Sequence, residues 1–99
     1  MLENLHLEAF SEHLNSNFSV GRGEAGAVEL QLIEAQSVGQ PAPGYEQFSL
    51  LLRGPLDSLL EQAIYSFKHD ALGTFEMFIV PVQQTQDGFI YQSIINRPL

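Results

Sequence analysis

Short apolar stretches that follow one another closely, with turn-forming residues between them, are the feature that most constrains how this chain can fold. Between residues 28 and 32, valine and leucine at the even positions alternate with glutamate and glutamine at the odd positions. A period of two buries one face of a strand and exposes the other. We therefore predict about six strands, at residues 18–20, from residue 27 onward, and at 45–53, 64–69, 74–82 and 89–96.

The stretch that begins at residue 27 has a competing interpretation as a helix, because glutamate, leucine, glutamine and alanine all favour helices. The strict alternation favours a strand. Ile33 interrupts the alternation and indicates a β-bulge, in which one extra residue shifts the register.

A chain of 99 residues, 44% of them apolar, is enough for one core, so we predict a single domain spanning 1–99. The spacing of Leu7, Phe10 and Leu14 predicts a short helix over residues 7–15. The strands then occupy residues 17–96, and no helical crossover separates them. We predict a mostly β fold, a six-stranded antiparallel meander that forms a small barrel or half-barrel and is plugged by the N-terminal helix.

The charge balance argues against nucleic acid as a partner. Twelve Asp and Glu against four Lys and Arg give a net charge of −8. The basic residues are scattered singly, whereas phosphate backbones bind clustered positive charge. Cysteine is absent, which excludes disulfides, thiolate metal sites and cysteine nucleophiles.

The sequence shows no membrane or export signal. Its first residues contain neither a basic segment nor a continuous apolar stretch, and no run approaches the ~18 apolar residues of a membrane span. We expect a cytoplasmic protein without membrane contact.

Patterns that resemble ligand sites have a structural interpretation here. Gly21, Gly23 and Gly26 match the spacing of a nucleotide-binding loop, but a strand pattern follows them, so we interpret them as a hairpin turn. The three histidines lack a spacing that converges on one metal ion, and no serine lies in a nucleophile elbow. We expect no cofactor, no metal and no enzymatic activity.

Two of the predicted strands carry apolar residues on both faces. Packing one face of the sheet against a core would bury only half of these residues. The two strands contain the leucine run at 50–52 and the mixed apolar run at 77–82. Either the helix and loops cover both faces, or another chain buries one of them. The segment 89–95 is also uncharged and ends the meander, so its edge is open to pairing if the sheet does not close. We predict contact with another protein chain, or self-association, through Phe78, Val80, Phe89, Tyr91, Ile94 and Ile95.

A second group of residues is predicted to have structural roles. Arg53 is the one basic residue in an apolar strand. We expect the five N–H donors of its guanidinium to form hydrogen bonds with carbonyls or a carboxylate at the end of the strand. Gly54 and Pro55 stop that strand, and His69 and Gly73 border the hairpin turn of the next one.

Three motifs resemble those of a known family. The chain reads F-S-L-L-L-R-G-P at 48–55, H-D-A-L-G at 69–73 and V-P-V at 80–82. It is similar over nearly its whole length to an uncharacterised bacterial family, a small domain of unknown function. His6 stands where that family has a helix-capping threonine, so its helix start is less well capped. The family has no assigned activity, and its occurrence beside phage-tail-collar-like proteins implies a role in a tail-derived fibre.

These observations support two hypotheses. The first is a non-enzymatic structural or protein-interaction module, part of or accessory to a phage-tail-like fibre assembly. The second is a small-ligand-binding or enzymatic β-barrel, in which polar strand residues converge inside the barrel. The residues that would do so are Gln47, Ser49, Glu76 and Gln92.

Overall fold

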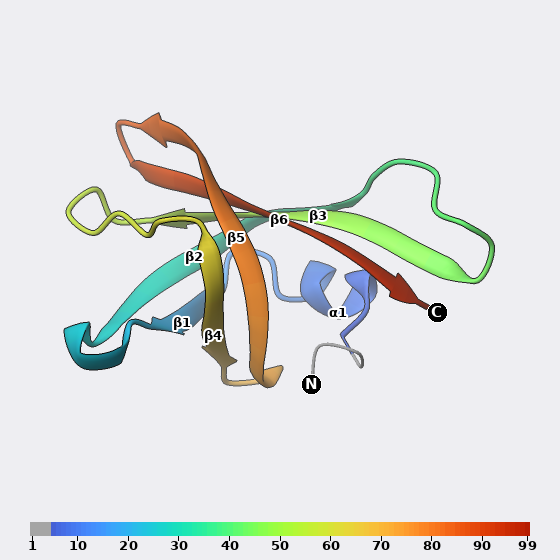
Figure 1. Ribbon diagram of the computed structural model, residues 1–99, viewed down its shortest axis with the longest axis horizontal. Coiled ribbons are helices and arrows are strands. Elements are labelled where there is room, and N and C mark those ends of the chain that lie inside the picture. The colour runs from blue at the N-terminus through green and yellow to red at the C-terminus, as the bar shows by residue number, and fades with distance from the viewer. Residues whose placement is uncertain (1–4) are drawn as a thin grey trace.

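The computed structural model of the protein describes residues 5–99, apart from the side chain of Ala25. It confirms a mostly β fold with six antiparallel strands and one short α-helix (Figure 1). The elements are α1 (Leu7–Ser11), β1 (Asn17–Gly21), the 3-10 turn η2 (Gly23–Ala25), β2 (Ala27–Ser37), β3 (Tyr45–Gly54), β4 (Ala63–His69), β5 (Gly73–Thr85) and β6 (Gly88–Pro98). No helix within residues 5–99 is long and apolar enough to span a membrane.

The six strands form one closed ring, in the order β1-β2-β3-β6-β5-β4. This order differs from a single meander, because β3 pairs with β6 instead of β4 and the ring closes where β1 pairs with β4. The chain therefore forms two three-stranded meanders. The segment 55–62 that joins them is anchored at Leu60, which is buried and whose N–H donates to the hydroxyl of Tyr91 at 2.9 Å.

The segment that begins at Ala27 is the strand β2, as its alternating sequence predicted. Its even-numbered residues from Val28 to Leu32 are buried. Its register against β3 shifts between Leu32 and Glu34, which confirms the bulge at Ile33. A second shift lies in β5 between Pro81 and Gln83. A bulge accommodates proline within a strand, because the ladder is already interrupted there.

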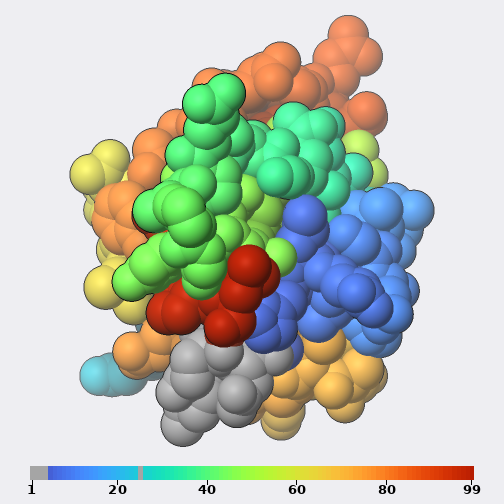
Figure 2. Space-filling model, turned by 90° about the vertical axis from the view of Figure 1, so that its right-hand side faces the viewer, coloured from blue at the N-terminus to red at the C-terminus, as the bar shows by residue number. Residues whose placement is uncertain are grey.

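The helix plugs one end of the ring. Phe10 of α1 is fully buried, and its ring centroid lies 5.8 Å from that of Phe48 and 5.9 Å from that of Phe75. Figure 2 shows this end, where the C-terminal residues (red) lie beside the β2–β3 loop (green) and the chain at α1 (dark blue). The side chain of Arg97 connects β6 to the residues before α1 by donating from Nη1 to the carbonyl of Leu5 at 2.9 Å.

The helix is shorter than the predicted 7–15, because it ends at Ser11. The chain turns over the next residues, and Asn15 takes a left-handed conformation with φ 70°. The N–H of Asn15 donates to the carbonyl of Leu32 at 2.7 Å. Pairing with β2 therefore redirects the backbone before another helical turn can form.

Candidate functional site

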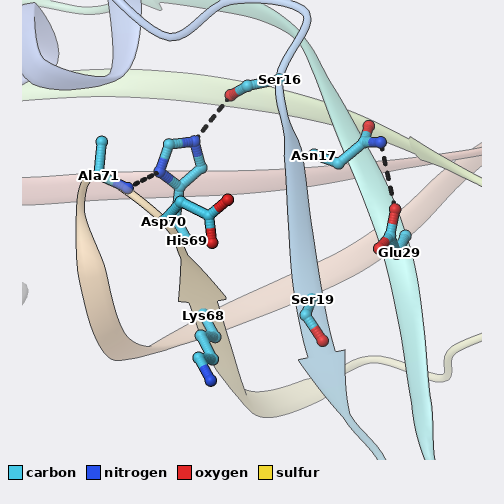
Figure 3. Close-up of a pocket in the computed structure, with 8 residues that line it drawn as sticks. All are labelled: Ser16, Asn17, Ser19, Glu29, Lys68, His69, Asp70 and Ala71. Carbon is cyan, nitrogen blue, oxygen red and sulfur yellow. Dashed lines mark hydrogen bonds between the residues drawn. The ribbon is translucent and has the colours of Figure 1, made fainter.

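A polar cleft of about 590 Å³ lies at the seam where β1 meets β4 (Figure 3). The ladder at this seam is short: it consists of the pairs Ser19↔Lys68 and Val20↔Phe67. The cleft is lined by Ser16, Asn17, Ser19, Glu29, Lys68, His69, Asp70 and Ala71.

The imidazole of His69 is the most constrained group in this cleft. Its Nδ1 accepts hydrogen bonds from the backbone N–H groups of Ala71 at 3.0 Å and Leu72 at 3.1 Å. An Nδ1 that accepts two N–H groups carries no proton, so the neutral ring holds its proton on Nε2. Nε2 then donates to the hydroxyl of Ser16 at 2.9 Å, and that hydroxyl donates to the carbonyl of His13 at 2.5 Å.

Burial lowers the pKa of His69 below its usual 6.5, and nearby His13 adds to this effect while Asp70 opposes it. A general base that activates serine needs Nε2 as the acceptor and Nδ1–H bonded to a carboxylate. In the His69–Ser16 pair both roles are reversed, because Nε2 is the donor to the serine and Nδ1 is an acceptor of backbone N–H groups. The geometry therefore indicates that His69 stabilises the β4–β5 turn by accepting its backbone N–H groups. Gly73 ends that turn in a left-handed conformation with φ 86°.

The polar strand residues that would line a ligand cavity do not converge inside the ring. Ser49 and Gln92 lie on the outer face and bond to each other, with Nε2 of Gln92 donating to Oγ of Ser49 at 3.0 Å. Glu76 is exposed, and Gln47 is partly buried near the start of β3. Most of the positions that face inward are filled by large apolar side chains instead.

The six predicted interaction residues separate into two groups. Phe78 and Ile94 are 49% and 52% exposed, and Val80 is half-buried on the same strand as Phe78. Tyr91 and Ile95 belong to the core, and Phe89 packs against it. Tyr91 and Ile95 therefore offer no interaction surface, and Phe89 is only partly exposed.

The last strand is expected to have an open edge if the sheet does not close, and the strands close into a ring. β6 pairs with β3 along its length, from Gly54↔Phe89 to Tyr45↔Pro98, and the first part of β6 also pairs with β5. Up to Gln92 the strand therefore lies between two neighbours, and beyond Gln92 it pairs with β3 alone. Its inward-facing residues Tyr91 and Ile95 pack in the protein's own core.

A groove of about 380 Å³ lies on the outer face between β5 and β6. Ile64, Phe78 and Ile94 stand in its walls and form what we call the apolar patch. Ile64 of β4 is 65% exposed and lies directly opposite Phe78 in the register. The prediction from sequence missed Ile64. Its side chain lies on the same strand face as those of Ser66 and Lys68, and two polar residues at alternate positions indicate that this face is exposed to solvent.

The end of β3 is held by its neighbours across the sheet. Nη2 of Arg53 donates to Oε1 of Gln31 at 2.6 Å, so its partner is a side-chain amide on β2. Gly54 has no room for a side chain, because a Cβ there would overlap the buried side chain of Leu30. Pro55 is exposed and begins the segment that leads to β4.

A family profile described as a domain of unknown function (DUF6916) matches residues 5–95. The chain belongs to the DUF6916 family. The DUF6916 match begins just before α1 and ends within β6, so it includes the His69 cleft and the apolar patch. Comparisons with curated proteins and with solved structures gave no match.

Proposed function

We propose that this DUF6916 domain is a non-enzymatic structural or protein-interaction module that binds another protein through the apolar patch. The supporting observation is that Ile64, Phe78 and Ile94 are each about half exposed or more, on three successive strands of one face. Contiguous exposed apolar groups of this kind mark interaction surfaces. The net charge of −8 opposes non-specific aggregation and favours one directed contact.

We further propose that the partner belongs to a phage-tail-like fibre assembly, of which the domain is a part or an accessory. This finer proposal rests on the resemblance of the motifs at 48–55, 69–73 and 80–82 to a family found beside tail-collar-like proteins. The apolar patch is compatible with such a role, because assembly proteins bind through apolar surfaces that are exposed before assembly.

The test compares Phe78→Glu with a matched control, Leu14→Glu. Both positions carry large apolar side chains that are more than 40% exposed, so both variants are expected to fold. Leu14 lies in the turn after α1, away from the groove. We expect a partner captured from the native host by the parent to be retained by Leu14→Glu and lost with Phe78→Glu. Equal capture by both variants would contradict the proposal.

The second candidate, a small-ligand-binding β-barrel, is favoured by one observation, the polar cleft beside His69. Native mass spectrometry and light scattering of the purified protein separate the two candidates. A strict monomer that captures no protein, while a metabolite co-purifies and is lost with Lys68→Ala, would replace the interaction module with the ligand-binding function.

A further inference from the structure

β5 and β6 are paired for only part of their length. Their ladder runs from Thr85↔Gly88 to Val80↔Gln92, and no residue pair joins them beyond it in the part of the chain that the structure describes. Over Gly73–Ile79, β5 pairs with β4 alone, and after Gln92 β6 pairs with β3 alone. Figure 1 shows the two strands leaving their shared hairpin and diverging. In a strand, alternate N–H and C=O groups point to each side, so both stretches present backbone groups toward the gap.

Two features accompany this separation. Pro81 cannot donate to the ladder, and a bulge lies between Pro81 and Gln83, two residue pairs before the ladder ends at Val80↔Gln92. Beyond that point Phe10 of α1 packs in the core against Phe75 of β5 and Phe48 of β3. The free edges are therefore built into the folded chain.

The groove coincides with this unpaired region. Its β5 wall is Glu76, Met77 and Phe78, and its β6 wall consists of residues 93–96. Met77 and Ile95 are buried at its base, whereas Phe78 and Ile94 rise beside it. Apolar pockets flanking a free strand edge are the two elements that β-strand addition requires, since the edge gives affinity and the pockets give specificity.

The charge of the groove indicates the chemistry of the occupant. Glu76 is the one charged side chain in its lining, it is exposed, and within residues 5–99 it makes no ion pair. Its partner in the β4 register is Ser66, which is neutral. A basic side chain on the occupant would complement both this carboxylate and the net charge of −8.

A second copy of the chain does not fit these requirements. Every strand in the described part of the chain is already held along at least one edge within the ring, so a second copy has no unpaired strand that could enter the groove. The β2–β3 loop carries Pro41 and Pro43, which lack the N–H groups that a ladder needs. Two copies would also bring together surfaces of the same net charge.

We propose that the groove receives an extended segment of another protein, which adds as a strand to the free edge of β5. Its alternate apolar side chains contact Phe78 and Ile94, and a lysine or arginine lies beside Glu76. This inference rests on the proposed function and specifies the partner's chemistry.

The probe is a nine-residue peptide of alternating valine and threonine that begins and ends with valine and has lysine in place of the central valine, so that the lysine and the remaining valines share one face. Three matched peptides accompany it: one with glutamate for the lysine, one of scrambled order, and one N-methylated at alternate residues, which keeps the side chains and removes ladder donors. Binding is followed by amide chemical shifts of the labelled, full-length protein. We expect the lysine peptide to shift the amides of residues 74–79. N-methylation and scrambling should each weaken binding about tenfold or more, and glutamate should weaken it about two- to fivefold.

Glu76→Gln provides the charge control, and it should reduce the difference between the lysine and glutamate peptides. If the N-methylated peptide binds as tightly as the parent peptide, strand addition is refuted while docking on the apolar patch survives. If no peptide binds, or light scattering shows a dimer that Phe78→Glu dissolves, the inference is refuted. Failure of the proposed function is seen separately, as a host partner whose capture is unaffected by Phe78→Glu.

Discussion

The Nε2 of His69 lies 2.9 Å from the hydroxyl of Ser16, while the other ring nitrogen accepts two backbone N–H groups of the following turn. Protonation of Nδ1 would place an N–H against those two donors and break both hydrogen bonds. The same ring is buried against Phe18, with centroids 4.5 Å apart. The pair thus links the β4–β5 turn to the chain that leads into β1, and the link requires a neutral imidazole.

This linkage makes stability depend on pH. Burial, with His13 nearby, lowers the pKa of His69 in the folded protein below the value of 6.5 expected when unfolded. Between those two pKa values the unfolded chain binds more protons, so stability rises with pH in that window. We expect the free energy of unfolding to be highest above 6.5 and to fall as pH decreases through the folded-state pKa. Urea unfolding from about pH 5 to about pH 8 measures this, and a slope identical in His69→Gln would contradict the assignment.

Gly88 is expected to tolerate no side chain. It has φ 154°, and a Cβ there would overlap the backbone carbonyl oxygen of Gly54, which cannot move aside as a flexible side chain can. We expect Gly88→Ala to lower the free energy of unfolding by about 1–3 kcal/mol or more. Gly21→Ala is the matched control, because nothing lies within 4 Å of a Cβ at that position. Similar urea midpoints for the two variants would show that β3 and β6 do not approach closely here.

Arg53 is expected to stabilise the β2–β3 pair modestly. Its hydrogen bond to Gln31 is partly buried, so Arg53→Ala should cost about 0.5–1.5 kcal/mol. Gln31→Ala removes the same bond from the other side, and the double variant should therefore cost less than the sum of the single variants. Strict additivity in thermal or urea unfolding would show that the two side chains do not interact.

Two neighbouring isoleucines provide a test of strand parity. Ile94 is 52% exposed, whereas Ile95 is 6% exposed and packs in the core. We expect Ile94→Lys to keep its fold with a change of about 0.5 kcal/mol or less, and Ile95→Lys to unfold because it buries an unpaired charge. Circular dichroism and urea unfolding distinguish these outcomes. If Ile94→Lys unfolds while Ile95→Lys folds, the register of β6 is reversed.

The positions of the strands could be predicted from the sequence because alternation is a local property. The strand predicted at 45–53 is observed as Tyr45–Gly54, and that predicted at 64–69 as Ala63–His69. The bulge at Ile33 was equally visible, because a bulge interrupts the period of two where it occurs. Apolar groups on both faces also identified Phe78 and Ile94, which the structure leaves exposed.

By itself, then, the sequence determined which residues form strands and which side chains alternate. Only the tertiary structure decided which strands are neighbours. The contact of β3 with β6 joins Tyr45 to Pro98, and a pairing at such separation leaves no local pattern. It placed Tyr91 and Ile95 in the core, because closing the sheet into a ring turns one face of β6 toward the interior. It also exposed the β5 edge, since the divergence of β5 and β6 beyond Val80↔Gln92 depends on the strands with which each of them pairs elsewhere in the ring.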